Sequence, residues 1–394
     1  MSTELTGGSL ARGLGDESRV HWPLRRSSEI FELRYGKALV ESSRRPGHVP
    51  VYGTNGKTGE HDIALFAGPG VIIGRKGAGH LGVHWADTDF WVIDTAYSLV
   101  PTSEVDLKYA YYLVKHVGLN HLKHGTSNPS LTRDAFGAQY FPVPPLEEQV
   151  AIATTLGALD DKIESNRRAS DLLDQLARVT FREWRATVGV EQTVSFGAYA
   201  DVFGGATPKT TVSGYWDGHL AWATPTDLTA LSAPYLFDTG RKITEPGLAS
   251  CTAVLHPPGT ILMTSRATIG AFAINQVPTA TNQGFIAVRP RRDEDRWFLF
   301  EEMRSRVAEF IDNANGSTFL EISRGRFKEL PLSVPATSAI DELADRLDPV
   351  HSKAAQLSAE AQRLAALRDA LLPELLSGRI RVPEAAAVVQ DGTE

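Results

Sequence analysis

The chain has 394 residues, of which 42% are apolar and 22% charged, and this composition predicts a globular protein of two or three domains. No run approaches the ~20 apolar residues of a membrane span, and Met1 to Arg19 lack the apolar core of a secretory signal, so we expect neither a membrane protein nor a secreted one. Cys251 is the only cysteine, which excludes an internal disulfide and favours a reducing, cytoplasmic compartment.

The net charge of −7 argues at first against a nucleic-acid partner, because such partners are usually basic. The segments 145–184 and 336–394 together hold 18 acidic and 11 basic residues, which accounts for the whole imbalance. The rest of the chain has 29 of each sign. The charge therefore neither demonstrates nor excludes binding to DNA.

The second half of the sequence repeats the first at a displacement of 191 residues. No gap is needed between Gly125 and Pro144, and glycines, prolines and an aromatic residue keep their places. Because these residue types fix turns and corners, coincidence is a poor explanation. Two copies are too few for a solenoid, so the sequence indicates a duplicated domain pair. The matched pairs are Arg75 and Arg266, Gly79 and Gly270, Gly125 and Gly316, Arg133 and Arg324, Phe136 and Phe327, Val143 and Val334, and Pro144 and Pro335.

Each copy has the same internal order along the chain. Short β-like runs such as Gly70–Gly79 and Gly259–Gly270 come first, and an aromatic helical segment follows at Leu107–Leu122 or at Trp297–Ile311. A glycine-led loop, a proline corner and a long helix complete the copy. We therefore expect an α+β protein with two similar mixed α/β domains, separated by two long helices and related by a pseudo-two-fold repeat. The predicted segments are 1–143 (first domain), 144–185 (central helix), 186–335 (second domain), 336–382 (C-terminal helix) and 383–394 (flexible tail).

The central helix begins at Pro144-Pro145, with acidic residues just inside its first turn. Its apolar seam alternates steps of four and three over about five heptads, which is typical of a coiled coil; two unusually long core helices are the alternative. Asn166 falls on this seam, where a polar residue commonly fixes the register. The seam comprises Ile152, Leu156, Leu159, Ile163, Asn166, Ser170, Leu173, Ala177, Thr180 and Trp184.

The C-terminal helix keeps the same spacing at the same displacement. Pro349 lies inside this seam and lacks an amide hydrogen, so we expect a kink or a restart there. A second break is expected at Pro373, before a glycine cap at Gly378. The seam comprises Leu343, Leu347, Val350, Ala354, Leu357, Ala361, Leu364, Arg368, Leu371 and Leu375.

Three motifs resemble chemical sites, but none of them predicts a catalytic or metal-binding site. Gly53–Thr58 ends like a phosphate-binding loop but has Val51 where the first glycine belongs, so a polar turn or a DNA-facing loop fits better. Asn128–Leu131 lacks the second proline and the aromatic residue of an amino-methyltransferase motif. His116, His121 and His124 do not share one helical face, so solvent-facing histidines are favoured over a metal site. No cofactor loop or nucleophile motif was found, and we expect no catalytic or metal-binding residues.

Arg75-Lys76 and Arg266 each follow a β-like run and precede a glycine, which predicts an exposed turn. Arginine in such a loop suits bidentate contact with a guanine edge or a phosphate. A salt bridge within the domain, or a scaffold contact shared by both copies, explains these residues equally well.

Four longer segments resemble a known family. They are FPVPPLEEQVAIATTLGALDDKIESNRR (Phe141–Arg168), LRDALLPELLSGRIRV (Leu367–Val382), GGATPKTTVSGYWDGHLAWATPTDL (Gly204–Leu228) and VPVYGTNGKTG (Val49–Gly59). Through them the chain resembles the specificity (S) subunit of type I restriction-modification systems over nearly its whole length.

The resemblance implies two target-recognition domains that read the halves of a bipartite, asymmetric site in double-stranded DNA, and two antiparallel helices that set their distance. It implies two modification subunits that carry S-adenosylmethionine, restriction subunits in the full complex, and no cofactor in this chain. Contacts to DNA are then expected from Thr54, Asn55, Lys57, Arg75, Lys76, His80, Thr207, Lys209, Arg266, Thr268, Asn282 and Gln283. Helix and partner contacts are expected from Ile152, Leu156, Leu159, Ile163, Leu173, Leu343, Leu347, Leu357, Leu364 and Leu371.

Two alternatives remain at this point. A stand-alone nuclease or methyltransferase with duplicated recognition domains would need an acidic metal site or a cofactor loop. A scaffold that links two proteins would need no DNA at all.

Overall fold

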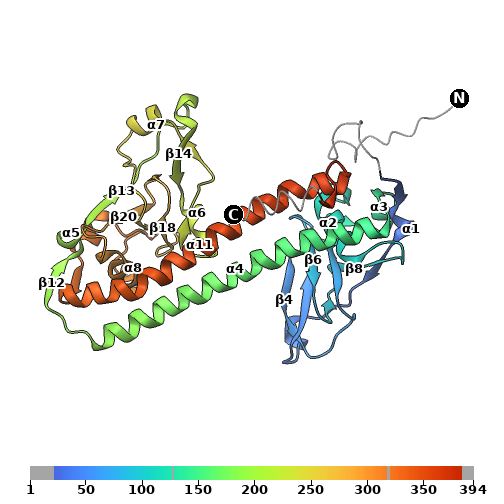
Figure 1. Ribbon diagram of the computed structural model, residues 1–394, viewed down its shortest axis with the longest axis horizontal. Helices are drawn as coiled ribbons and strands as arrows, with labels where there is room; N and C mark the ends of the chain where they lie inside the picture. Colours follow the sequence, from blue (N-terminus) through green and yellow to red (C-terminus); the bar gives the residue numbers. More distant parts are fainter. Residues whose placement is uncertain (1–21, 127, 317–319, 384–394) are drawn as a thin grey trace. The chain divides into compact units, whose positions relative to one another are not determined.

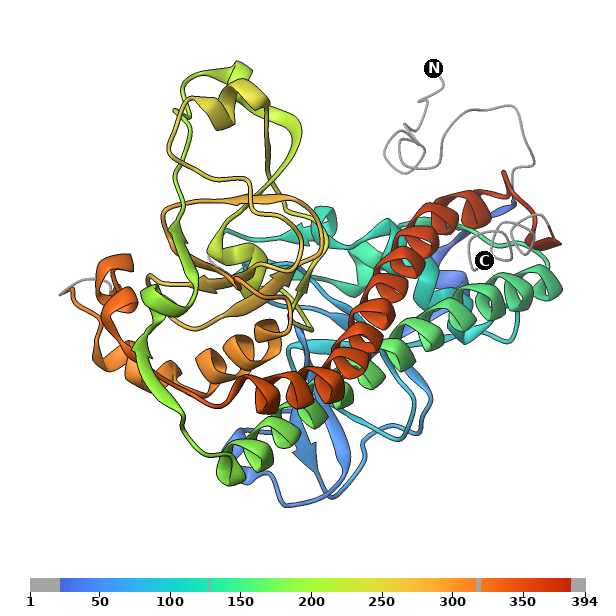
Figure 2. The ribbon, with the colours of Figure 1, turned by 60° about the vertical axis from the view of Figure 1, so that its left-hand side comes forward.

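The computed structural model describes residues 22–126, 128–316 and 320–383, and the chain divides into two compact units. Unit 1 combines residues up to 162 with those from 364 onward, and unit 2 is the continuous segment 163–363. Two long helices belong to both units, α4 (Leu146–Thr187) and α11 (Thr337–Ser377), drawn green and red in Figures 1 and 2.

Unit 1 is built on an antiparallel four-stranded sheet with the order β2-β8-β5-β6. Its central strand β5 is apolar and completely buried, as the run of valine and isoleucine predicts. The helix α2 (Leu107–Val117) is capped by Asp106, whose carboxylate accepts a hydrogen bond from the Tyr109 amide at 2.8 Å. The strands are β2 (Phe31–Tyr35), β8 (Ala96–Pro101), β5 (Gly70–Gly74) and β6 (Val83–Ala86).

A second, three-stranded sheet of unit 1 has the order β4-β3-β7, and two further strand pairs, β1-β11 and β9-β10, close the domain. The remaining elements are β1 (Leu24–Arg26), α1 (Ser27–Ile30), η2 (Glu41–Ser43), β3 (Val49–Gly53), β4 (Gly56–His61), β7 (Trp91–Val92), η3 (Asn120–Leu122), β9 (Lys123–His124), β10 (Ser130–Leu131), α3 (Arg133–Gly137) and β11 (Tyr140–Pro142).

Unit 2 repeats this plan with the sheets β13-β20-β17-β18-β15 and β16-β14-β19 and the pair β12-β21. Its strands are β12 (Gln192–Ser195), β13 (Asp201–Gly204), β14 (Trp216–Ala223), β15 (Tyr235–Leu236), β16 (Lys242–Ile243), β17 (Ile261–Thr264), β18 (Phe272–Asn275), β19 (Thr279–Thr281), β20 (Phe285–Arg289) and β21 (Pro331–Val334). Its helices are α5 (Phe196–Tyr199), η4 (Ser213–Tyr215), α6 (Pro225–Thr229), α7 (Glu245–Ala249), α8 (Asp295–Ser305), α9 (Val307–Asp312) and α10 (Arg324–Glu329).

Backbone contacts confirm the duplication. Gly36 and Gly205 follow the equivalent strands β2 and β13, and a Cβ on either would lie 2.0–2.2 Å from a backbone carbonyl oxygen of the neighbouring loop. The next amides make the same bond, from Lys37 to the Val92 oxygen and from Ala206 to the Thr281 oxygen, both at 2.9 Å. Only glycine permits this close approach, and both copies use it.

The displacement of 191 is wrong by one residue around the two arginine loops. The Arg75 amide bonds to the Thr95 oxygen, and in unit 2 it is the Ser265 amide that bonds to the equivalent Gly284 oxygen, both at 2.8 Å. Lys76 consequently forms a backbone β-bridge with Ser130, and Arg266 forms the equivalent β-bridge with Glu321. The structural counterpart of Arg266 is therefore Lys76, because equivalence here follows the strand register.

Most seam residues of the long helices are buried, as predicted. Leu173 and Leu357 are only half-buried. The expected restart at Pro349 and the expected break at Pro373 are wrong, because α11 is continuous from Thr337 to Ser377. A kink at Pro349 stays a prediction. Packing of the seam residues around each proline offsets its missing hydrogen bond. The buried members from the partner-contact set are Ile152, Leu156, Leu159, Ile163, Leu343, Leu347, Leu364 and Leu371.

The two helices run antiparallel in each unit. In unit 2 the Ser170 hydroxyl lies 3.0 Å from the Ala354 oxygen and 2.8 Å from the Ser358 hydroxyl. In unit 1 Arg368 donates to Asp160 at 2.6 Å. Both units thus use a polar contact to hold the helices in register beside the apolar seam.

Candidate nucleic-acid interface

Three loops of unit 1 meet at one end of its strands. They are the β3–β4 turn, the loop after β5 and the β7–β8 loop. The Thr54 hydroxyl lies 2.8 Å from the Lys76 carbonyl oxygen and 2.7 Å from that of Thr95. The Thr54 carbonyl accepts a hydrogen bond from the Gly82 amide at 3.1 Å. Thr54 therefore joins the three loops through these hydrogen bonds.

The motif that resembled a phosphate-binding loop is a tight hairpin. Thr54 and Asn55 connect β3 to β4, and Gly56 has a φ of 108°. A phosphate-binding loop would lead into a helix, and here it leads into a strand. Asn55 and Lys57 are exposed, and Lys57 forms an ion pair with Glu60 at 2.7 Å.

Arg75 and Lys76 are less free than an exposed turn predicts. The half-buried Arg75 donates to the Asp94 carbonyl oxygen at 3.0 Å and lies over the rings of Tyr35 and Tyr97, at 4.9 and 5.5 Å. Burial raises the pKa of Tyr97 to about 12, so this ring stays a neutral phenol. Lys76 pairs with the Asp94 carboxylate at 3.2 Å. For Arg75 the geometry favours the scaffold alternative, and its contact with DNA stays a prediction.

The loop after β5 is also held from outside. Lys123 Nζ lies 2.7–3.4 Å from the carbonyl oxygens of Gly77, Ala78 and Gly79. Asn120 accepts a hydrogen bond from the Leu81 amide at 2.9 Å and also contacts the exposed His80. Sequence reasoning missed Lys123 and Asn120, because their partners are backbone groups that lie about 40 residues earlier.

The histidines and other candidate ligands form no metal centre in the part of the chain that the structure describes. No group of three or more His, Cys, Asp or Glu side chains is placed to hold an ion there.

The equivalent end of unit 2 gathers three of the predicted residues. The Thr207 hydroxyl donates to the Gln283 side-chain oxygen at 2.5 Å, and Asn282 accepts a hydrogen bond from the Gly284 amide at 2.9 Å. The bond between Ser265 and Gly284 ties this group to the loop after β17.

Arg266, Thr268 and Lys209 are exposed around that end. Arg266 lies 3.7 Å from the Glu321 carboxylate with about half of its side chain in solvent, so this ion pair is weak. Ala267, next to it, has a φ of 61° and occupies the place that Gly77 fills in unit 1. The side chain of Lys209 points into solvent, and its carbonyl accepts a bond from the Trp216 indole at 3.3 Å.

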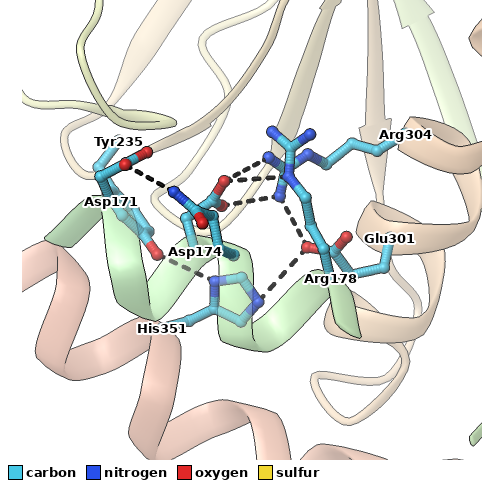
Figure 3. A network of polar contacts seen from close by, with 8 residues as sticks. Asp171, Asp174, Arg178, Tyr235, Glu301, Arg304 and His351 are labelled. Atoms are coloured by element: carbon cyan, nitrogen blue, oxygen red, sulfur yellow. Dashed lines mark hydrogen bonds and ion pairs between the residues drawn. The ribbon is translucent and has the colours of Figure 1, made fainter. Parts of the chain in front are cut away.

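A buried ionic network joins the long helices to the second domain (Figure 3). Arg304 of α8 makes two 2.8 Å hydrogen bonds to Asp174 of α4 and a third, of 2.7 Å, to Glu301. His351 of α11 stacks on Trp297 with ring centroids 3.9 Å apart. All four of the ionisable side chains are less than 10% exposed.

The surroundings set the protonation of this network. Burial raises the pKa of Glu301, while Asp174 keeps a lowered pKa because the bonds and charge of Arg304 outweigh its burial. Burial and the Arg304 charge lower the pKa of His351 to about 3. Nδ1 of the neutral His351 accepts a hydrogen bond from the Tyr235 hydroxyl at 2.9 Å, and its Nε2 lies 3.7 Å from a Glu301 carboxylate oxygen.

Unit 1 joins its long helices through different polar contacts at the position equivalent to His351. Asp160 of α4 stands 191 residues before His351 and receives hydrogen bonds from Tyr112 of α2 at 2.7 Å and from Arg368 of α11 at 2.6 Å. The shared scaffold thus carries two diverged sets of polar contacts. Neither Asp160 nor Asp174 stands out in the sequence, because acidic residues are abundant along both helices.

Two copies of one α+β domain, each joined to an antiparallel helix pair, define an internally duplicated two-domain protein. A family model described as "Type I restriction modification DNA specificity domain" matches residues 19–175 and 192–366. The chain belongs to this family. No helix of the described residues is long and apolar enough to cross a membrane.

Individual relatives agree with the family. The solved S subunit of a type I restriction-modification system from M. genitalium covers 92% of this chain and 98% of its own, with a TM-score of 0.65 and 19% identity, and so shares the fold. The MjaIX specificity subunit of Methanocaldococcus jannaschii is 36% identical over 146 residues, which are 36% of this chain and 34% of the relative. The HindI specificity subunit of Haemophilus influenzae is 28% identical over 127 residues, which are 32% of this chain and 28% of the relative. The chain thus spans about a third of the length of these two relatives.

Proposed function

We propose that this chain is the DNA-reading specificity subunit of a type I restriction-modification complex. Each domain reads one half of a bipartite, asymmetric site in double-stranded DNA. The observation that carries the proposal is the pair of equivalent loop ends, one holding Thr54 and Lys76 and the other Thr207 and Arg266. A repeated scaffold with diverged loops reads two different sequences in one fixed geometry.

The base contacts are expected from exposed polar side chains at these ends. Asn55 and Gln283 suit bidentate contact with adenine, and Arg266 suits guanine or a phosphate. Arg75 serves the loop scaffold through its carbonyl and aromatic contacts. Replacing it should disturb the first half-site through the shape of the loop and leave the second half-site unchanged.

The chemistry belongs to the partners in this proposal. Two modification subunits, one for each repeat, bind S-adenosylmethionine and methylate adenine in the cytoplasm, and restriction subunits join the complex to cleave DNA. Support comes from the charged outer faces of α4 and α11, which offer polar surfaces to partner helices, and from the absence of a cofactor loop in the sequence. The helix pair sets the gap between the two half-sites.

Methylation of plasmid DNA by purified components tests the proposal. The chain alone with S-adenosylmethionine should transfer no methyl groups, and addition of the modification subunit should produce methylated sites with two separated specific parts. Methylation by the chain alone would support the stand-alone methyltransferase instead. A complex that neither shifts nor methylates any DNA would support the protein scaffold.

A further inference from the structure

A second kind of DNA contact is suggested by a cationic cluster beside the reading loops. Arg133, the first residue of α3, lies over the exposed ring of Tyr35 at 4.0 Å, and Arg75 lies over the same ring at 4.9 Å. Neither guanidinium forms an ion pair with a carboxylate of the described residues. Two like charges therefore share one exposed aromatic ring with no anion between them.

Unit 2 places an arginine at the same point. Arg324 begins α10 at the displacement that relates Arg133 to it. Its side chain crosses Gly204, the counterpart of Tyr35, where an added Cβ would lie 3.9 Å from Arg324 Nη1. Arg324 is exposed and forms no ion pair with a described carboxylate.

These arginines lie next to the loops proposed to read bases. In unit 1 the Leu131 amide bonds to the Arg75 oxygen at 2.8 Å, and α3 begins two residues later. In unit 2 the Ile322 amide bonds to the Ser265 oxygen at 3.0 Å, and α10 begins two residues later. Arg133 thus lies between the loop after β5 and Tyr35, and Arg324 lies between the loop after β17 and Gly204.

An ion pair with a described carboxylate explains neither position. A cation in the first turn of a helix opposes the helix dipole. The carboxylate near Arg133 is Glu32, whose pKa is lowered first by hydrogen bonds from Arg34 and least by the charge of Arg133. An exposed guanidinium held without a carboxylate matches the planar, bidentate oxygens of a phosphate.

We propose that Arg133 and Arg324 are a matched pair of phosphate contacts, one for each half of the DNA site, which fix the duplex against the reading loops irrespective of its sequence. In unit 1 the phosphate sits beside Tyr35, where the charge of the neighbouring Arg75 adds to the positive potential. This inference rests on the proposed function, because it takes the ends of the domains as the DNA-binding surface.

Binding by the complex of this chain with its modification subunit tests the inference. Two duplexes of equal length are used at 50 to 200 mM salt. One contains the sequence that the complex methylates, called the methylated site, and the other lacks it. Loss of one phosphate contact makes the slope of log K against log salt less negative by about 0.9, so the deficit of Arg133→Ala should shrink about 3.5-fold over this range. Arg324→Ala should behave alike, and both variants should weaken the two duplexes equally.

Arg34→Ala is the matched control, since Arg34 is exposed, precedes Tyr35 and is paired with Glu32 at 2.9 Å. Arg133→Lys should retain most of the slope, because lysine still meets a phosphate as a point charge. Among the described residues Arg324 contacts no aromatic ring, so Arg324→Ala keeps the test valid if Arg133→Ala lowers the thermal stability.

The inference is overturned if the slopes of Arg133→Ala and Arg324→Ala match that of Arg34→Ala, or if either variant weakens only the duplex with the methylated site. Failure of the wild-type complex to prefer that duplex would instead refute the proposed function, and the duplex without the site would still test the phosphate contact.

Discussion

Replacing Asp174 by asparagine tests the buried network as the fastening between α4 and the second domain. The carboxylate of Asp174 and the guanidinium of Arg304 are 9% and 8% exposed and share two 2.8 Å bonds. Removing one partner of a buried ion pair costs 3–5 kcal/mol, and because Arg304 keeps Glu301 we expect about 3 kcal/mol. That cost corresponds to an opening equilibrium about a hundredfold larger.

Hydrogen exchange followed by mass spectrometry separates this effect from global unfolding. Amides of α8 in unit 2 should exchange about a hundredfold faster in Asp174→Asn, while those of α2 in unit 1 keep their protection. Glu164→Gln is the control, since Glu164 forms an exposed pair with Arg168 on the same helix and its loss should cost less than about 1 kcal/mol. If the amides of α8 exchange at the same rate in both variants, the network does not hold α8 and the inference from burial is wrong.

Three further changes test other features. Acid should destabilise unit 2, because His351 is unprotonated in the folded state with a pKa of about 3 and titrates near 6.5 when unfolded. The contribution of His351 to the free energy of unfolding is complete above pH 6.5 and falls by about 2 kcal/mol by pH 5. The free energy of unfolding of His351→Gln should therefore depend less on pH than that of the wild type. An unchanged pH dependence would refute this assignment. Pro349→Ala should raise the thermal midpoint, because the exposed proline removes a backbone hydrogen bond from the interior of α11 at a cost of up to ~3 kcal/mol. A lowered midpoint would show that the proline stabilises the folded chain. Four helix-forming residues inserted between Asn166 and Leu173 add ~6 Å, so the gap in the methylated site should grow by one or two base pairs at ~3.4 Å each. An active variant with its original gap would show that another element sets the spacing.

The helices and the duplication could be predicted because both depend on periodic or rigid residue types. A seam such as Leu343, Leu347 and Leu364 is visible wherever apolar residues recur at helical spacing. The matched glycines and Phe136 with Phe327 survive in both copies because turns and a buried ring tolerate little change.

What the sequence did not predict depends on partners that are distant along the chain. The one-residue shift that pairs Lys76 with Arg266 is decided by strand register, and no residue type marks it. The helix continues through Pro349 and Pro373 because tertiary packing outweighs a local helix-breaking tendency. Asp174 and Arg304 are ordinary charged residues until folding buries them together, 130 positions apart.

The composition of unit 1 has a consequence for synthesis on the ribosome. Unit 2 is one uninterrupted stretch and is complete once Arg363 has emerged, whereas unit 1 needs the final segment from Leu364 onward. Arg368 reaches Asp160, and the ring of Trp22 meets the guanidinium of Arg381 at 4.6 Å. The domain translated first is therefore the last to close, and until then the apolar stripe of its helix, including Leu156, is exposed to chaperones and to premature pairing with a neighbouring nascent chain.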